Sequence, residues 1–284
     1  MPVPPARSTT NVAKGLTVTT VNVNGIRAAQ RRGGLEWLAR TDPDLILLQE
    51  VRATHEQLHA CLQSSGLSGY HVAHAPAPQL GRAGVAILSK APFVRSEQAT
   101  GEQQLDALGR WVEAEVVTER GRVTVVSAYV HTGEADTPRQ DEKFAFLEAM
   151  DERLSALAAR AKRRKEHVII GGDFNIAHHE IDIKNWRANR GKAGFMLEER
   201  AYLDRWFARN WVDLGRRLGG DGPGPYTWWS WRGRGFDTDG GWRIDYLICT
   251  PGLSTHAVRA EVGKAATYAE RWSDHAPLSV AFSD

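Results

Sequence analysis

Apolar runs and amphipathic segments alternate along most of the chain. The short apolar runs predict strands, and the run within 44–49 has no polar residue between its two ends, as expected for a strand buried on both faces. A turn at Arg120-Gly121 joins two of the runs into a hairpin. In the first half of the chain the predicted strands are 16–23, 44–49, 84–88, 111–117 and 123–130.

Amphipathic segments predict the helices. A short helix is expected at 34–40, and Thr54 with Gln57 forms a capping box that opens a second helix. Thr137-Pro138-Arg139-Gln140 combines an N-cap, a proline at the first helical position and a capping-box glutamine. The helix that begins there is predicted to continue to about Arg164, with acids early and bases late. Its apolar face consists of Phe144, Leu147, Met150, Leu154, Leu157 and Ala161.

The second half of the chain repeats the arrangement of the first. Its predicted elements are a strand ending at Gly171, a helix at 197–209, and strands near Tyr226, at 243–249 and at 278–282. Each half opens with a buried strand that ends in polar side chains, Asn22 and Asn24 in one, Asp173 and Asn175 in the other. This similarity predicts an α/β fold in which two mixed sheets pack face to face and are covered by helices, a four-layered sandwich. No linker separates the halves, so residues 16–284 are expected to form one domain.

Composition excludes several classes of protein. The 284 residues are 42% hydrophobic and 25% charged, which is ordinary for a globular chain. Cys61 and Cys249 match no metal-binding spacing and are expected to be buried free thiols. No apolar stretch approaches the roughly 18 residues that a membrane span needs. Residues 1–15 lack a signal-peptide core and are expected to be disordered, so we predict a cytoplasmic location.

The net charge of +2 is small, but basic residues are concentrated in one region. Between Lys184 and Arg234 there are 11 Lys and Arg against 5 Asp and Glu. A local excess of this kind attracts phosphates, although a solvated surface explains it equally well.

Two polar clusters follow apolar runs and point to chemistry. Gly172-Asp173-Phe174-Asn175 ends one predicted strand, and residues two apart there face the same side. About a hundred residues later comes Ser273-Asp274-His275. Asp245 lies within an apolar strand, where burial would be costly unless it pairs with His275. Taken singly, each of these residues is as well explained by structural hydrogen bonding; together they indicate metal-assisted attack on a phosphate ester.

Glu50 follows the buried run at 45–49, and a carboxylate at the end of a buried strand favours pairing or a cation. Hard cations such as Mg²⁺ take carboxylate oxygens. The simpler explanation is a surface residue just past a strand, and Asn24-Gly25 alone is most often a turn.

Aromatic residues are unusually dense between Tyr226 and Trp231, with Trp242 following. Such rings usually pack in a core. Here glycines and arginines interleave at 232–235, which is typical of a surface that binds exposed nucleotides or sugars. The segment 184–192 has neither helical nor strand periodicity, so it is either a solvated loop or a loop that contacts a nucleic-acid backbone.

The order of these motifs resembles the exonuclease III family of apurinic/apyrimidinic endonucleases over nearly everything after residue 16. The elements that carry the resemblance are Asn22-Val23-Asn24-Gly25-Ile26-Arg27, Leu48-Gln49-Glu50, Gly172-Asp173-Phe174-Asn175-Ile176-Ala177-His178, Trp242-Arg243-Ile244-Asp245-Tyr246 and Ser273-Asp274-His275. Deoxyribonuclease I, inositol-polyphosphate phosphatases, sphingomyelinases and deadenylases share only Gly-Asp-x-Asn and Ser-Asp-His. The DNA-repair branch is favoured by Glu180-Ile181-Asp182-Ile183-Lys184-Asn185 and Ala193-Gly194-Phe195.

The resemblance implies roles for these residues. Asp173 would position or deprotonate the attacking water with help from Asn175, and His275, held by Asp245, would contact the phosphate. Tyr129 resembles a tyrosine that touches the scissile phosphate. Mg²⁺ or Mn²⁺ would be ligated by Glu50. The residues implied to support or surround the metal are Asn22, Asn24, Asp173, Asn175, Asp274 and His275.

The resemblance also implies how DNA is held. An everted abasic nucleotide would enter a pocket walled by Trp228, Trp242 and Ile244. The residues implied to approach the DNA are Asn185, Arg187, Asn189 and Arg82, which stands where some relatives have an aromatic residue. The loop after Tyr129 carries Glu134 and Asp136 and no obvious inserting arginine, so grip on the duplex is expected to depend on Arg82 and the basic segment.

The predicted function is therefore metal-dependent incision 5′ to abasic sites in duplex DNA, with 3′→5′ exonuclease and 3′-phosphodiesterase or phosphatase activity. The expected partner is duplex DNA with an abasic site or a blocked 3′ end; we expect a monomer with no obligate protein partner. Two alternatives remain: a phosphodiesterase acting on a phosphoinositide or small nucleotide, and a non-catalytic DNA-binding module.

Overall fold

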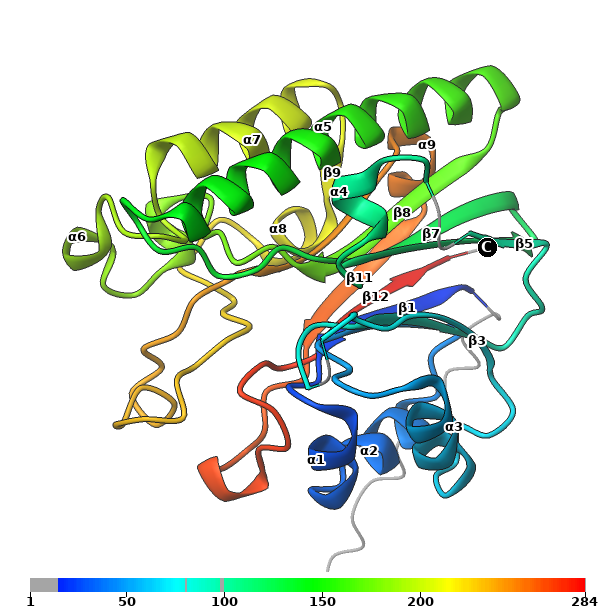
Figure 1. The fold of residues 1–284 in the computed structure, drawn as a ribbon, viewed down its shortest axis with the longest axis horizontal. Helices are drawn as coiled ribbons and strands as arrows, with labels where there is room; N and C mark the ends of the chain where they lie inside the picture. Colours follow the sequence, from blue (N-terminus) through cyan, green and yellow to red (C-terminus); the bar gives the residue numbers. More distant parts are fainter. Residues whose placement is uncertain (1–14, 80, 98–99, 284) are drawn as a thin grey trace, which may run out of the picture.

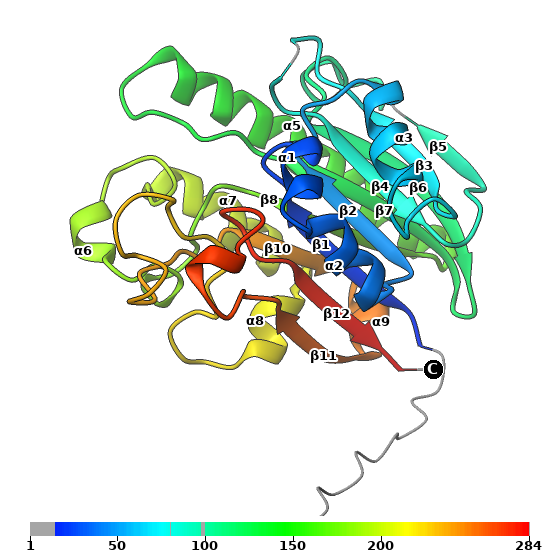
Figure 2. The ribbon, with the colours of Figure 1, turned by 90° about the horizontal axis from the view of Figure 1, so that it is seen from below.

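Two six-stranded sheets pack face to face in the computed structural model, which describes residues 15–79, 81–97 and 100–283 (Figures 1 and 2). The first sheet has the order β11-β12-β1-β2-β4-β3 and the second β5-β6-β7-β8-β10-β9. The strands are β1 Thr17–Asn22, β2 Leu45–Gln49, β3 His71–Ala75, β4 Val85–Ser89, β5 Arg95–Glu97, β6 Trp111–Thr118, β7 Gly121–Tyr129, β8 His167–Asp173, β9 Val212–Asp213, β10 Asp245–Cys249, β11 Ala257–Val262 and β12 Leu278–Phe282. The predicted mixed sheets are confirmed.

The two sheets repeat one local arrangement. In the first, β1 pairs in parallel with β2 and antiparallel with β12; in the second, β8 pairs in parallel with β7 and antiparallel with β10. Asn22 and Asp173 are the last residues of the equivalent strands β1 and β8. The sheets approach closely here, because a Cβ added to Gly171 would lie 2.5 Å from Leu47 Cδ1 and 3.0 Å from Thr20 Cβ.

Helices cover the outer face of each sheet, which makes four layers (Figure 1). The helices α1 Ile26–Arg31, α2 Gly34–Thr41 and α3 His55–Gln63 lie on the first sheet, and α5 Pro138–Arg164 and α7 Leu197–Ala208 lie on the second. The shorter elements are α4 Gln103–Asp106, η1 Glu180–Asp182, α6 Trp186–Asn189, α8 Leu214–Gly219, α9 Pro251–Ser254 and η2 Tyr268–Glu270. No helix within the described ranges is long and apolar enough to cross a membrane.

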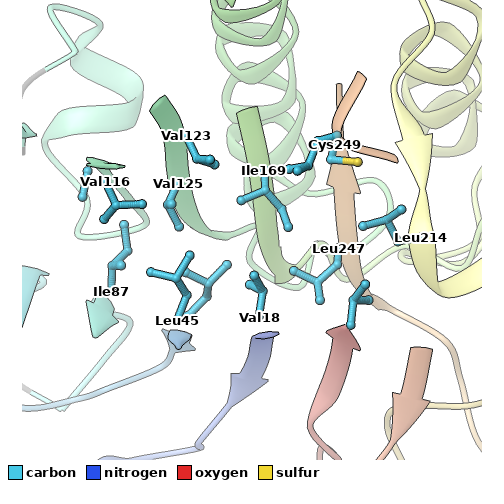
Figure 3. Close-up of a cluster of buried hydrophobic side chains, with 14 of the residues drawn as sticks. Val18, Leu45, Ile87, Val116, Val123, Val125, Ile169, Leu214, Leu247 and Cys249 are labelled. Carbon is cyan, nitrogen blue, oxygen red and sulfur yellow. The ribbon is translucent and has the colours of Figure 1, made fainter. Parts of the chain in front are cut away.

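The central core lies between the two sheets. Val18 and Leu45 from one sheet meet Val125, Ile169 and Leu247 from the other, as Figure 3 shows. Cys61 and Cys249 are both buried and free, as predicted. Separate apolar clusters join each sheet to its helices.

The predicted helix caps are confirmed at α3 and only in part at α5. The capping box of Thr54 and Gln57 is confirmed. At α5 the N-cap residue and the proline are right, but the capping box is wrong. The Thr137 hydroxyl donates to Glu134 O, and Gln140 is buried against Glu199 instead.

The predicted strand near Tyr226 is also wrong. Only isolated bridges form there, at Trp228, and the Thr227 hydroxyl accepts hydrogen bonds from the backbone N–H groups of Ile244 and Asp245. The strand predicted from Arg243 begins at Asp245. Four short strands, β3, β5, β9 and β11, were not predicted, and the tail at 1–14 lies outside the described residues.

Candidate active site

The polar strand ends predicted from the sequence converge at one end of the sandwich. Asn22 ends β1, Glu50 follows β2, Asp173 ends β8 and Asp245 begins the antiparallel neighbour β10, so their side chains meet where the sheets face each other. A cavity of about 260 Å³ opens there. It is lined by Glu50, Thr132, Asp173, Asn175, Ala193, Gly194, Trp228, Trp242, Ile244, Asp274 and His275. A larger cavity, of about 580 Å³, lies around Leu16, Ser89 and Val117, but contains none of these groups.

Asn22 links the two halves of the site. Its Nδ2 donates to Glu50 Oε1 and to Asp173 Oδ2, both at 2.9 Å. Its Oδ1 accepts from the backbone N of Asn24, so the orientation of the amide is defined. Asn22 therefore holds two carboxylates in place through its amide nitrogen.

Asn175 orients Asp173. The Asn175 backbone N donates to Asp173 Oδ1 at 2.9 Å, and its Nδ2 donates to Asp173 Oδ2 at 3.1 Å and to Val130 O at 2.8 Å. These contacts hold Asn175 at a φ of 49°. Burial raises the pKa of Asp173 to about 8, although the charge of His275 opposes this. A raised pKa makes the ionised carboxylate a stronger proton acceptor than an exposed one, which suits a general base.

His275 lies between two buried carboxylates. Its Nδ1 is 2.8 Å from Asp245 Oδ2, and its Nε2 is 3.6 Å from Asp173 Oδ2. Burial lowers the pKa of His275, but Asp245 and Asp173 outweigh burial and raise it to about 10. The imidazole therefore carries a proton at neutral pH. Its Nε2–H can donate to an oxygen that gains negative charge in the cavity.

Asp274 is held on the other wall by two donors. Asn24 Nδ2 donates to its Oδ1 at 2.8 Å, and Trp228 Nε1 to its Oδ2 at 3.1 Å. Burial alone would raise the pKa of Asp274, but His275 and these hydrogen bonds lower it. Asp274 is thus an anion at neutral pH.

The carboxylate oxygens around the cavity are suitable ligands for a hard divalent cation. The carboxylates of Glu50, Asp173 and Asp274 are held by asparagine amides, and oxygen atoms of this kind are what Mg²⁺ and Mn²⁺ prefer. Asp173, Asp245 and His275 also form a group whose possible ligand atoms all lie within 4.8 Å. The His275 Nδ1 is paired with Asp245, which leaves its Nε2 facing Asp173. Glu50, whose second oxygen pairs with Arg52, borders the opening.

The residues implied for the lesion pocket gather beside His275. Trp228 and Trp242 meet edge to face with centroids 6.1 Å apart, and Ile244 joins them in one apolar cluster. Tyr129 ends β7 and pairs with Asp173 of β8. Its burial and the charges of Glu50 and Asp173 raise its pKa well above the ordinary value, so it stays a neutral donor.

The residues implied for DNA contact lie further out. Asn185 and Arg187 are exposed near α6, which extends from the same end of the sandwich (Figures 1 and 2). Asn189 is half-buried, and its Nδ2 donates to Asn185 O at 2.9 Å. Arg82 is exposed but lines a separate cavity beside His55.

Sequence reasoning missed several supporting residues. Lys143 is fully buried, and its Nζ donates to Glu199 Oε1 at 2.7 Å and to Asn175 O at 2.9 Å. Arg243 is likewise buried between Asp182 and Asp213. A signal existed for Lys143, since a lysine lies four residues before Leu147 on the apolar face of α5.

Residues 19–275 match the Endonuclease/Exonuclease/phosphatase family. The chain belongs to this family. The matched range covers every polar group of the site from Asn22 to His275.

Relatives within the family include DNA-repair nucleases. The chain is 33% identical to an exodeoxyribonuclease of Bacillus subtilis over 91% of its length and 96% of the relative. It is 30% identical to exodeoxyribonuclease III of Haemophilus influenzae, covering 92% of this chain and 97% of that one. These relatives confirm the predicted resemblance to the exonuclease III family and support a hydrolytic nuclease of DNA repair.

A solved structure has the same fold. The 3′-5′ exonuclease of Neisseria meningitidis, 26% identical, superposes with a TM-score of 0.79 over 95% of this chain and 100% of that one. A related structure, of a 3′ phosphatase from Neisseria bound to a product DNA hairpin, gives a TM-score of 0.80 at 26% identity, with the same coverage of both chains.

Proposed function

We propose that this family member is a metal-dependent phosphodiesterase that incises duplex DNA 5′ to abasic sites and also processes 3′ ends. The observation that carries the proposal is the series Asp245–His275–Asp173, in which the buried imidazole lies between two buried carboxyl groups at 2.8 and 3.6 Å. Next to it, Asn22 and Asn175 orient the second carboxylate.

Each group has one chemical task in this proposal. Asp173 takes a proton from water as the water attacks phosphorus in line with the leaving oxygen. His275 Nε2–H and Tyr129 donate to the non-bridging oxygens, where negative charge develops. Mg²⁺, held by Glu50 with Asp274 nearby, would act as a Lewis acid for the phosphate and the leaving oxygen when bound.

The apolar side of the cavity supports selectivity for a nucleotide that lacks its base. Trp228, Trp242 and Ile244 line a cavity of about 260 Å³ next to the acid–base groups. An everted sugar without a base fits such a space, and eversion there costs little stacking energy. The exposed arginines near α6 would hold the flanking phosphates.

The deciding assay uses a labelled duplex with one abasic site, with Mg²⁺, Mn²⁺ or EDTA, and resolves both product ends. We expect incision with either ion, none with EDTA, and a loss of at least about 10²-fold in Asp173→Asn. Asp204→Asn is the matched control, because Asp204 is an exposed acid on α7 bonded to His178. Its rate should equal that of the unmodified protein.

Two results would support other functions. Faster cleavage of a soluble inositol phosphate than of the abasic duplex would favour a phosphatase of the same family. Tight binding of the duplex without cleavage in either ion would indicate a non-catalytic module. A monomeric state and a cytoplasmic location stay predictions, to be checked by sedimentation and by fractionation of the host cell.

A further inference from the structure

A group of histidines outside the active site lies on α3 and β3. The first turns of α3 read His55-Glu56-Gln57-Leu58-His59, so two histidines are four residues apart on a helix. Side chains at this spacing lie above one another on one face, and this spacing on a helix is known to bind zinc. Both side chains are exposed.

A third histidine approaches this face from the neighbouring strand. His74 of β3 is buried, and its Nδ1 lies 3.2 Å from the Nδ1 of His55. The two rings are nearly perpendicular, at 82°, with centroids 4.7 Å apart.

These distances match two imidazoles that converge on one ion. With Zn–N bonds of about 2.05 Å and a near-tetrahedral angle, the nitrogens lie roughly 3.3 Å apart and the centroids roughly 5 Å apart. A straight N–H···N hydrogen bond of the observed length would place the centroids roughly 5.5 Å apart. The observed 4.7 Å is therefore closer to the converging arrangement.

His59 lies one turn further along α3 than His55, on the same face of the helix, although its nitrogens do not complete a close group with those of the other two histidines in the structure.

We propose that His55, His59 and His74 form a binding site for a transition-metal ion of the Zn²⁺ class. His55 and His74 supply the preformed pair, and rotation of the exposed His59 side chain adds the third nitrogen. Three histidines leave a fourth position for water. A bound ion would join α3 to β3 beside the cavity lined by Thr54, Glu56 and Arg82.

Zinc titration of the purified, chelator-treated full chain tests the site. Calorimetry is done with Zn²⁺, and visible absorption with Co²⁺ reports coordination geometry; both are done in excess Mg²⁺ so that carboxylate sites are saturated. We expect the double variant His55→Ala/His59→Ala to bind one equivalent of Zn²⁺ fewer than the unmodified chain. It should also lack the visible absorption bands that Co²⁺ gives in a low-symmetry site. Zinc should raise the melting temperature of the unmodified chain but not that of the double variant.

His71→Ala is the matched control, because His71 is an exposed histidine on the same strand as His74. It should keep the full stoichiometry. Both changed positions in the double variant are exposed, so its circular dichroism without zinc should match that of the unmodified chain. Because His55→Ala also removes the contact with His74, the effect of zinc is measured against the zinc-free melting temperature of each protein. An unchanged zinc stoichiometry and affinity in the double variant would overturn the proposal, whatever the outcome of the DNA assays.

Discussion

His275 owes its charge to its neighbours. Burial alone would leave it neutral, but Asp245 and Asp173 keep a proton on the ring. Asp245 is itself placed by its backbone N–H, which donates to the Thr227 hydroxyl at 3.1 Å. The proton on His275 therefore depends on a residue that does not line the cavity.

Replacing Asp245 with Asn should separate this role from folding. Asn keeps the shape and one hydrogen bond but removes the charge that holds the proton. We expect kcat on abasic duplex to fall by about 10²-fold with KM changed far less. Steady-state kinetics and a melting curve measure the two effects. An unchanged kcat would show that the imidazolium has no part in the reaction.

His131 makes the stability of the fold dependent on pH. Its Nδ1 lies 2.7 Å from Arg110 Nη1 and its Nε2 lies 3.2 Å from Arg139 O, an arrangement that suits the neutral ring. Burial and Arg110 lower its pKa to about 4. The unfolded chain, with an ordinary pKa near 6.5, takes up the proton first as pH falls.

Acidification should therefore destabilise the protein between about pH 6.5 and pH 4. The contribution of His131 is fully present above that window, and between pH 7 and pH 5 about 2 kcal/mol is lost. Urea unfolding at both pH values measures it. His131→Asn should show a smaller drop between the two pH values, and an equal drop would rule out His131 as the source. His74 adds a drop of the same sign in both proteins.

One buried ion pair connects the helices α5 and α7 to the active site. Lys143 and Glu199 are fully buried, and the Lys143 Nζ also donates to the carbonyl of Asn175, the residue that orients Asp173. Glu199 Oε2 in turn accepts from the backbone N of Gly194 at 2.6 Å. The packing of α5 and α7 thus supports the backbone at Asn175 and at Gly194.

Removing only the lysine of this pair should destabilise the fold more than removing both charges. Lys143→Met leaves the Glu199 carboxylate buried without its cation, so we expect a loss of about 3–5 kcal/mol in the free energy of unfolding. Lys143→Met/Glu199→Gln removes both charges and should recover part of that loss. Urea unfolding of both single variants and the double variant gives the coupling energy, and strict additivity would contradict the pairing.

Sequence periodicity identified most long elements, because a strand such as β8 or a helix such as α5 repeats its pattern over many residues. Strands such as β3 and β11 were not predicted, because they have little apolar alternation and depend on pairing with a neighbouring strand. In the site, residues at strand ends were found from their cost of burial. Lys143 and Arg243 were missed, because their partners lie 56 and 61 residues away along the chain.

At the level of the whole molecule, the basic segment around α6 and the cavity lie at the same end. The segment around α6 projects there (Figure 1), and its Arg187 and Arg190 guanidinium groups both stack on Trp186, at 4.4 Å. Both arginines are exposed, so their charge is available to a duplex that enters the cavity.

Binding to duplex DNA should therefore weaken with salt. Arg187→Ala/Arg190→Ala should weaken binding and lower the slope of log K against log salt by about one unit per arginine. Fluorescence anisotropy over a salt series, with the abasic duplex in EDTA, measures the slope. Lys162→Ala, an exposed residue near the other end of α5, is the control and should leave the slope unchanged.

Asn22 belongs to the first sheet, yet one of its amide hydrogens goes to Glu50 beside it and the other to Asp173 on the opposite sheet. Neither half of the chain therefore contains a complete active centre. The hydrogen bond from Asn22 holds the Asp173 carboxylate in place only while the two sheets stay packed together. Loss of turnover in mild denaturant should thus report slippage between the sheets before either sheet loses its own hydrogen bonds.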